Sequence, residues 1–410
     1  MRGIFIKLTS HFHIIIMCKK NSYCLFFLLF IFSNGFAQIN QIPNTIKWSE
    51  KMALSIMKRH PEAYQIDEKT APKWDYVHGL VLNSFQKLYQ KTNDKKYFDY
   101  VKNYADATID SLGNVQSYQY DNFNIDMIAA GNILFDLYET TADERYLKVM
   151  QQLRNQLKNQ PRTQSGGFWH KKIYPNQMWL DGLYMGAPYY THYTTQFEKG
   201  KDLDDVANQF KIIQANATDA TTGLLYHGWD ESKQMPWANK TTGCSPNFWS
   251  RSMGWYMMAL VDVLDFFPKE HPRHKELVNY LNQISKSIIK QQDQSGLWYQ
   301  VTDKGSSEGN YIESSASSMF IYALAKGANK GYLPKKYFKM ANKAFDALIK
   351  DLIKTDADGQ IHITQACAVA GLGGKPYRDG SYSYYVNERK KDDDPKATGP
   401  FILAALELNR

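Results

Sequence analysis

The amino-acid sequence predicts an all-α protein whose helices form an (α/α)6 barrel in a single domain. Apolar residues repeat with helical spacing in about twelve segments, whereas strand-like segments are few. These segments alternate between amphipathic helices with charged faces and helices that are apolar around most of their circumference. Because a helix that is apolar all round must be buried, the alternation indicates an inner ring of helices inside an outer ring.

The elements follow one another in a regular order along the chain. The predicted outer helices span residues 46–59, 95–111, 143–158, 202–216, 271–292 and 335–353. The predicted inner helices span residues 75–91, 124–140, 181–196, 248–266, 314–330 and 397–409. Two short segments, 297–301 and 361–364, have strand character and could form small hairpins.

The N-terminal segment, residues 1–37, is typical of a secretory signal peptide. Lys19 and Lys20 precede an apolar run at 24–32, and small residues lead to a cleavage site after Ala37. The predicted (α/α)6-barrel domain is therefore residues 38–410. We expect export through the inner membrane, to the periplasm or the extracellular space.

Charge and cysteine content limit the possible partners. Removal of a leader with four basic residues and no acidic ones lowers the net charge from +8 to about +4, which provides no basic stripe for nucleic acid. No later run is apolar and long enough for a membrane helix. Cys244 and Cys367 are too few for a disulfide scaffold and have no metal-ligand spacing, so we expect no metal. The two could form one bridge or remain buried thiols, and we favour buried thiols. We expect a monomer or a weak dimer.

Polar and aromatic motifs stand where the predicted inner helices begin. They occupy residues 74–79, 124–126, 179–181, 249–251, 313–315 and 398–399. If neighbouring helices are antiparallel, all six inner N-termini lie on one face of the barrel. Six converging helix N-termini form a bowl that favours an anion.

Several of these motifs together resemble the unsaturated rhamnogalacturonyl hydrolases of glycoside hydrolase family 105, related to the unsaturated glucuronyl hydrolases of family 88. The resemblance is carried, in order, by Phe-Trp-His at 168–170, Trp-Leu-Asp-Gly-Leu-Tyr-Met at 179–185, His-Gly-Trp-Asp at 227–230, Phe-Trp-Ser-Arg-Ser-Met-Gly-Trp at 248–255 and Tyr-Arg-Asp-Gly-Ser at 377–381. It implies hydration of the C4–C5 double bond of a 4,5-unsaturated uronic acid, after which the sugar rearranges and the rest of the oligosaccharide leaves. It implies no cofactor.

The resemblance also implies roles for the acidic residues. Asp181 would be the general acid/base, because a carboxyl among apolar neighbours can protonate the alkene carbon and then help to deliver water. Asp126 would orient the uronic ring or the water. For both residues the alternative is a helix cap, since an acid at the start of a helix commonly binds free N–H groups.

The remaining candidates would bind the sugar. His227 would polarise hydroxyls or the attacking water, although a loop histidine is commonly a surface residue. Arg251 and Trp255 share one helix face, and Arg251 could bind the uronate carboxylate or pair with an active-site aspartate. Flat aromatic faces would stack on sugar rings, although aromatic residues also build cores; the candidates are Trp74, Tyr76, Trp179, Trp249 and Trp255. His170 matches a further family position near the pocket.

Two other functions fit the same residues. A different (α/α)6 enzyme, such as a glycosidase or a sugar epimerase, could also use Asp126 and Asp181. A helical carbohydrate-binding protein would use the aromatic side chains without catalysis. The sequence leaves open which sugar follows the uronic acid and whether the segment 375–396 covers the bowl.

Overall fold

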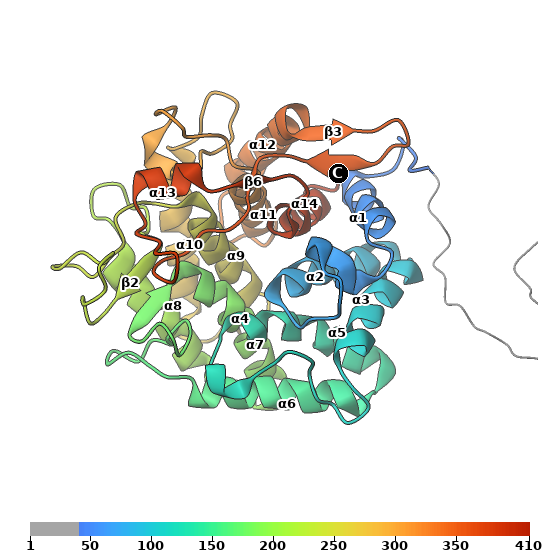
Figure 1. The fold of residues 1–410 in the computed structure, drawn as a ribbon, viewed down its shortest axis with the longest axis horizontal. Helices are drawn as coiled ribbons and strands as arrows, with labels where there is room; N and C mark the ends of the chain where they lie inside the picture. Colours follow the sequence, from blue (N-terminus) through green and yellow to red (C-terminus); the bar gives the residue numbers. More distant parts are fainter. Residues whose placement is uncertain (1–40) are drawn as a thin grey trace, which may run out of the picture. The chain divides into compact units, whose positions relative to one another are not determined.

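The helices form two concentric rings, as Figure 1 shows for the computed structural model, which describes residues 41–410. The inner ring comprises α2 (Tyr76–Thr92), α4 (Asp126–Ala129) with η3 (Ala130–Asn132) and α5 (Ile133–Thr141), α7 (Leu180–Phe197), α9 (Ser250–Val263), α11 (Ser314–Asn329) and α14 (Pro395–Glu407). The outer ring comprises α1 (Trp48–Arg59), α3 (Lys95–Thr108), α6 (Glu144–Asn159), α8 (Leu203–Ala217), α10 (His274–Ile289) and α12 (Lys336–Leu352). Each inner helix packs against the next, and α14 packs against α2, which closes the ring. The predicted (α/α)6 barrel is confirmed.

The two kinds of helix differ in burial as their sequences require. Every residue of α9 is buried, and so is α11 from Ser314 to Gly327. In α12 the buried residues recur every three or four positions and form one stripe, made by Tyr337, Ala341, Ala344, Phe345, Leu348 and Leu352. The described residues belong to one compact unit, and the predicted signal peptide lies outside them.

One inner helix differs from its prediction. The segment 124–140 is interrupted by the 3₁₀ turn η3 between α4 and α5. At this point α2 approaches very closely, because a Cβ atom on Gly79 would lie 2.5 Å from Cα of Ala130. The side chains of Asn132 and Gln86 donate to the carbonyl oxygens of Ala129 and Ile133, over 3.0 and 2.7 Å. These bonds satisfy carbonyl groups at a break in the regular helical ladder.

The strands form three short antiparallel pairs. They are β1 (Gln177–Trp179) with β2 (Gly228–Asp230), β3 (Ile353–Thr355) with β4 (Ile361–Ile363), and β5 (Ala366–Cys367) with β6 (Lys390–Lys391). The predicted hairpin at 361–364 is confirmed. The one at 297–301 is wrong, because in the described chain these residues form only isolated bridges, to Trp249 and Ile312. The remaining short helices are η1 (Ala63–Glu68), η2 (Tyr120–Asn122), η4 (Thr302–Lys304) and α13 (Tyr382–Asn387).

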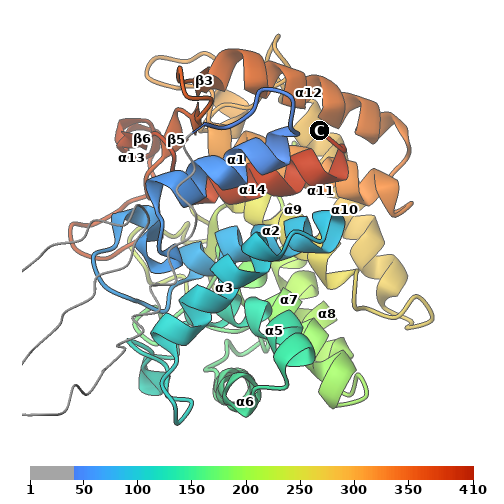
Figure 2. The ribbon, with the colours of Figure 1, turned by 90° about the vertical axis from the view of Figure 1, so that its right-hand side faces the viewer.

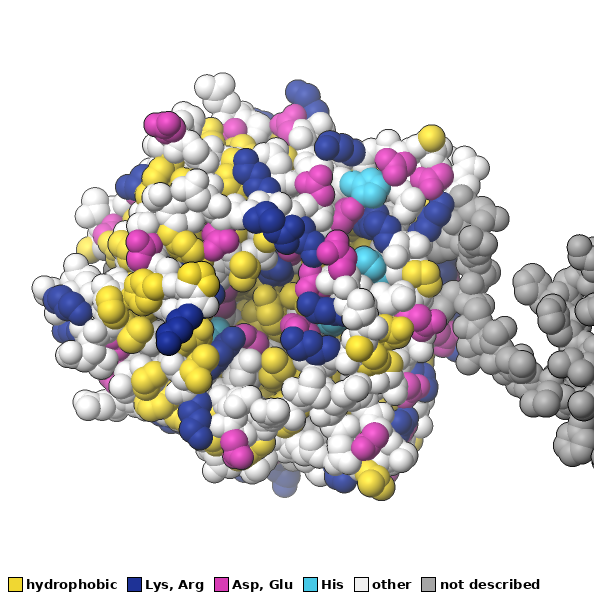
Figure 3. All heavy atoms as spheres, viewed as in Figure 1, with side chains coloured by type: hydrophobic (Ala, Val, Ile, Leu, Met, Phe, Trp, Pro, Cys, Tyr) yellow, Lys and Arg dark blue, Asp and Glu magenta, His cyan; other side chains and the backbone are white. Residues whose placement is uncertain are grey.

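Short elements gather at one end of the barrel. Figure 2 shows β5, β6 and α13 at one end of the long helices. Seen from the side of Figure 1, the molecule has a hollow near its centre, with hydrophobic side chains inside and acidic and basic ones around it (Figure 3). Among the described residues, the search for a helix with the length and hydropathy to span a bilayer finds none.

Candidate active site

Asp181 lies in the first turn of α7, directly after strand β1. Because β1 pairs with β2, the backbone N–H of Leu180 donates to the carbonyl oxygen of His227 over 3.0 Å. This pairing places Nε2 of His227 3.3 Å from Oδ2 of Asp181. The N-cap residue of α7 is Trp179, and this helix has no side-chain cap, so Asp181 does not serve as the N-cap. Its carboxyl side chain is 14% exposed.

His227 is completely buried and its two ring nitrogens face different partners. Nδ1 lies 2.7 Å from the hydroxyl oxygen of Tyr385, while Nε2 faces Asp181. Burial lowers the pKa of His227, and this effect outweighs the opposing influence of Asp181. The imidazole is therefore neutral at neutral pH. The alternative of an ordinary surface histidine is therefore wrong.

Asp126 is the first residue of α4 and is held as a carboxylate. Its oxygens lie 3.1 Å from Nε2 of His170 and 2.7 Å from Nζ of Lys171. Burial alone raises the pKa of Asp126, but the charges and hydrogen bonds of Lys171 and His170 outweigh burial and hold the pKa well below its usual range. The N-cap of α4 is Ile125, so Asp126 does not take the capping role either.

His170 packs tightly against the start of α7. Its ring stacks on Trp179 with centroids 4.6 Å apart, and it is 4% exposed. A Cβ atom on Gly182 would lie 2.9 Å from Nδ1 of His170, so the glycine after Asp181 leaves room for this ring. Nδ1 is buried and has no hydrogen-bond partner among the described residues.

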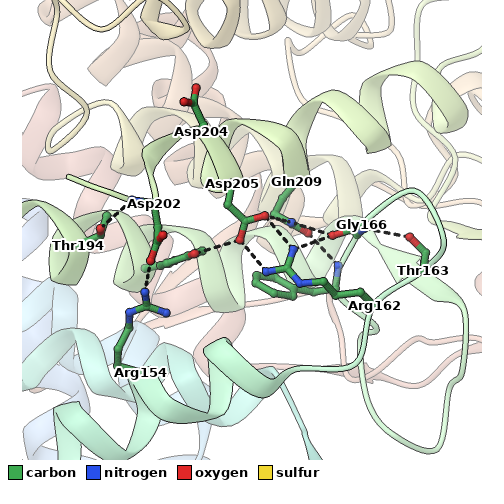
Figure 4. Close-up of polar contacts among 12 residues, drawn as sticks. Arg154, Arg162, Thr163, Gly166, Thr194, Asp202, Asp204, Asp205 and Gln209 are labelled. Carbon is green, nitrogen blue, oxygen red and sulfur yellow. Dashed lines mark hydrogen bonds and ion pairs between the residues drawn. The ribbon is translucent and has the colours of Figure 1, made fainter. Parts of the chain in front are cut away.

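The loop before His170 is fastened to the outer helix α8 (Figure 4). The Asp205 carboxylate accepts two hydrogen bonds of 2.7 Å from the guanidinium of Arg162. Oε1 of Gln209 accepts from the backbone N–H of Phe168 over 2.8 Å, and its Nε2 donates to the carbonyl oxygen of Gly166 over 3.3 Å. The outer ring therefore fixes the segment that carries His170 and Lys171 into the site.

Arg251 lies in the first turn of α9 and is 1% exposed. One terminal nitrogen donates to the carbonyl oxygen of Cys367 and, over 3.3 Å, to the hydroxyl of Ser315. Its Nε atom is buried without a hydrogen-bond partner in residues 41–410. No ion pair joins Arg251 to Asp126 or Asp181 in this part of the chain, so the alternative role as their partner is not realised.

Glu313 binds the two groups that accept hydrogen bonds from Arg251. Ser315 Oγ lies 2.8 Å from both Glu313 carboxylate oxygens, and the backbone N–H of Cys367 donates to Oε1 over 2.8 Å. The same carboxylate accepts from the backbone N–H groups of Ser315 and Ala316 and caps α11. A fully bonded carboxylate thus fixes both groups that accept from Arg251.

The five aromatic candidates are not equally placed. Tyr76 is partly exposed, whereas Trp179, Trp249 and Trp255 are only 6%, 1% and 1% exposed. The rings of Trp249 and His227 pack with centroids 4.7 Å apart, and those of Trp255 and Tyr76 with centroids 6.3 Å apart. Trp74 is fully buried, stacks on Tyr104 and donates from Nε1 to the carbonyl oxygen of Met127 over 2.8 Å, which makes it a core residue.

Sequence reasoning missed Lys171, Glu313 and Tyr385. Lys171 directly follows the Phe-Trp-His motif and Glu313 opens an inner helix, so their positions offered a clue. Tyr385 lies in the segment 375–396 and had none. Both Cys244 and Cys367 are free and buried, as expected. No cluster of three or more His, Cys, Asp or Glu side chains within residues 41–410 is arranged to hold a metal ion.

Comparisons with known proteins agree with this fold. A family model described as Glycosyl Hydrolase Family 88 matches residues 48–410. A solved structure of a C. acetobutylicum glycoside hydrolase from family 105 is 44% identical, with a TM-score of 0.85, and the match covers 89% of this chain and 99% of that chain.

Two curated proteins extend the comparison. The "24.9 kDa protein in picA locus" of Rhizobium radiobacter is 39% identical over 229 residues, 54% of this chain and 97% of that protein. The "Unsaturated rhamnogalacturonyl hydrolase YesR" of Bacillus subtilis is 24% identical over 315 residues, 75% of this chain and 84% of that protein.

Proposed function

Because the chain belongs to glycosyl hydrolase family 88, with a 44% identical relative in family 105, we propose that it removes a 4,5-unsaturated uronic acid from the non-reducing end of an oligosaccharide. The observation that carries the proposal is that the two acids have different partners. Asp126 is held ionised by Lys171, whereas Asp181 faces the neutral His227 and forms no ion pair with a lysine or an arginine within residues 41–410. An acid–base catalyst must hold a proton in one step and release it in another.

The reaction begins with transfer of a proton from the Asp181 carboxyl to C4 of the double bond. Positive charge then develops at C5, beside the ring oxygen, and a water molecule attacks C5 while the Asp181 carboxylate takes its proton. The product is a hemiketal at C5, and Asp181 is protonated again. Opening of the hemiketal and rearrangement at C1 release the rest of the oligosaccharide as an alcohol.

Asp126 and Arg251 would hold the uronic acid for this step. Asp126 accepts hydrogen bonds from sugar hydroxyls or from the attacking water, because it carries no proton to donate. Arg251 is buried and forms no ion pair with a carboxylate in residues 41–410, and an arginine fork matches the geometry of the uronate carboxylate. Tyr76, partly exposed beside Trp255, offers a ring face to the sugar.

For the sugar that follows the uronic acid we propose rhamnose, as in products of pectic rhamnogalacturonan. Support comes from the name of the B. subtilis relative, an unsaturated rhamnogalacturonyl hydrolase.

The test is the ultraviolet absorbance of the conjugated uronate during incubation with a lyase-generated rhamnogalacturonan disaccharide. Hydration removes the double bond, so the signal falls, and Asp181→Asn abolishes the fall. Asp204→Asn is the matched control, because this acid is 73% exposed on outer helix α8 and should leave turnover unchanged.

The failures of this test are distinguishable. Loss of absorbance only with other unsaturated disaccharides would retain the reaction and replace rhamnose. Constant absorbance with every unsaturated uronide would reject the reaction. It would then favour another (α/α)6 sugar enzyme, or a protein that binds carbohydrate without catalysis.

We also propose that the protein acts after export, as a monomer or a weak dimer. The basic, apolar and small-residue order of residues 1–37 supports cleavage after Ala37. Fractionation of the native host, with mass spectrometry of the mature N-terminus, tests export, and light scattering tests the oligomeric state. A cytoplasmic protein that retains the predicted signal peptide would reject the export proposal.

A further inference from the structure

A short helix from the C-terminal part of the chain reaches the proposed acid–base pair. Helix α13 carries Tyr385, whose hydroxyl lies 2.7 Å from Nδ1 of His227. Both side chains are 0% exposed. Neither the sequence motifs nor the proposed function gave this tyrosine a role.

The tyrosine is held firmly in this position. Nε2 of Gln300 donates to the carbonyl oxygen of Tyr385 over 3.1 Å, and Oε1 of Gln300 accepts from Nε1 of Trp249 over 3.0 Å. The rings of Trp249 and Tyr385 stack with centroids 6.0 Å apart. Ser381 caps α13 by accepting from the backbone N–H of Tyr384. The contacts of Gln300 and Trp249 therefore fix the phenol of Tyr385 against the imidazole of His227.

The number of protons decides the direction of the hydrogen bonds. Burial raises the pKa of Tyr385, so the phenol keeps its proton, and burial lowers the pKa of His227, so the imidazole has a single N–H. In a neutral imidazole one nitrogen donates and the other accepts. The proton of His227 is therefore on Nδ1, facing Tyr385, or on Nε2, facing Asp181.

Only one of these arrangements satisfies all the buried atoms. Nε2 of His227 and Oδ2 of Asp181 are buried, 3.3 Å apart, and neither has another hydrogen-bond partner in the described chain. A proton on Nδ1 would turn the Nε2 lone pair toward Oδ2, the buried oxygen of Asp181 that accepts whether the carboxyl is ionised or carries its catalytic proton on Oδ1, and would leave the phenol proton unused. A proton on Nε2 lets the phenol donate to Nδ1 and gives the carboxylate an N–H.

We propose that Tyr385 is a positioning residue: its hydroxyl donates to Nδ1 of His227, fixes the imidazole proton on Nε2 and so presents an N–H to Asp181. The consequence for catalysis rests on the proposed function. After Asp181 gives its proton to the alkene, the new carboxylate faces this N–H, which stabilises its charge as the reaction proceeds. Substrate binding does not use Tyr385, so its loss should lower kcat rather than raise KM.

The first measurement is ¹⁵N NMR of the full mature protein with labelled histidine. The resonances of His227 are assigned by their absence in His227→Gln. We expect the wild-type protein to show a neutral His227 protonated on Nε2 at neutral pH. A proton on Nδ1, or a positively charged ring, overturns the proposal, and this readout needs neither a tyrosine variant nor a substrate.

The second measurement compares Tyr385→Phe with Tyr384→Phe. The neighbouring Tyr384 hydroxyl accepts from the backbone N–H of Gly371 over 3.0 Å, and its removal should leave both the His227 tautomer and kcat unchanged. In Tyr385→Phe we expect the imidazole proton to redistribute between the two nitrogens, and kcat to fall about 10- to 100-fold with KM within about threefold, as for other residues that orient an active-site histidine. Unchanged kcat and tautomer in a folded Tyr385→Phe protein overturn the proposal.

The two proposals fail in different ways. If the wild-type protein hydrates no unsaturated uronide, the proposed function fails, while the tautomers of wild-type His227 and of Tyr385→Phe still decide the role of Tyr385. If hydration occurs and the tautomer is not controlled by Tyr385, only the present inference fails.

Discussion

The two ends of the helix pair α9 and α11 each carry a buried cation, and the two cations differ in their partners. At the N-terminal end, Arg251 in the first turn of α9 is 1% exposed, and its Nε atom has no hydrogen-bond partner in the described chain. In their last turns, Nζ of Lys326 lies 2.6 Å from Asp262, 2.6 Å from Asp265 and 2.9 Å from the hydroxyl of Tyr322. Burial alone lowers the pKa of Lys326, but the two carboxylates outweigh burial and raise the pKa.

This difference distinguishes the cation of the proposed binding site, Arg251, from a structural cation, Lys326. A buried ammonium with three partners has all its hydrogen bonds within the protein and none left for a ligand. At the opposite end, Arg251 Nε and His170 Nδ1 are buried without a hydrogen-bond partner among the described residues, and Asp181 Oδ2 and His227 Nε2 face only each other. Native proteins pair most buried polar atoms, and these atoms belong to the residues of the proposed site.

The largest effect should come from Asp181→Asn. An amide cannot donate a carboxyl proton, so we expect turnover to fall by at least about 10²- to 10⁴-fold. The unfolding midpoint should change little, because Asp181 does not cap its helix. Measurement of kcat with the unsaturated disaccharide, together with thermal unfolding, checks both parts. Near-normal kcat would remove Asp181 from the acid–base role.

The next effect should appear at the other end, in Lys326→Met. This change leaves Asp262 and Asp265 buried without their cation and should lower the free energy of unfolding by about 3–5 kcal/mol. The kcat of the folded protein should stay the same. Lys330→Met is the control, because this lysine pairs with Asp265 but is 49% exposed, and its loss should cost less than about 1 kcal/mol. Equal destabilisation by both variants in denaturant titrations would contradict the contrast.

A smaller effect is expected for Arg251→Lys. The ammonium keeps the charge but loses the planar fork, and hydrogen bonds to charged groups contribute about 1.5–3 kcal/mol each. We expect KM for the unsaturated uronide to rise about 10- to 100-fold, and the free energy of unfolding to fall by less than in Lys326→Met, because an ammonium can still donate to the carbonyl oxygen of Cys367. Steady-state kinetics and denaturant titration separate the two. A loss of stability without a rise in KM would place Arg251 with Lys326, as a structural cation.

The smallest effect concerns pH. His227 has a lowered pKa in the folded state, so the unfolded chain binds its proton more readily as the pH falls below about 6.5. The contribution of neutral His227 to stability is therefore fully present above that pH and declines in more acidic solution. His227→Gln should lose less stability than the wild-type protein between about pH 7 and pH 5 in denaturant titrations. Parallel curves would show that His227 does not titrate on unfolding.

The two rings of helices could be predicted from the sequence because the burial of a helix determines the spacing of its apolar residues. The spacing of apolar residues in α12 and the uninterrupted apolar character of α9 can each be read within a single helix. The motifs at the starts of the inner helices likewise located Asp126, Asp181 and Arg251. The break at η3 could not be read, because it accompanies the close approach of Gly79 from another helix.

The polar partners of the site were decided only by the tertiary structure. His227 and Tyr385 are 158 residues apart in the chain and meet because α13 packs on Trp249. Likewise, nothing local shows that Lys171 pairs with Asp126, or that Trp74 turns into the core. Helical periodicity is a property of neighbouring residues, so the sequence by itself determined the barrel and the positions of its acids. Hydrogen bonds and protonation depend on which distant groups share a buried space, and folding alone brings those groups together.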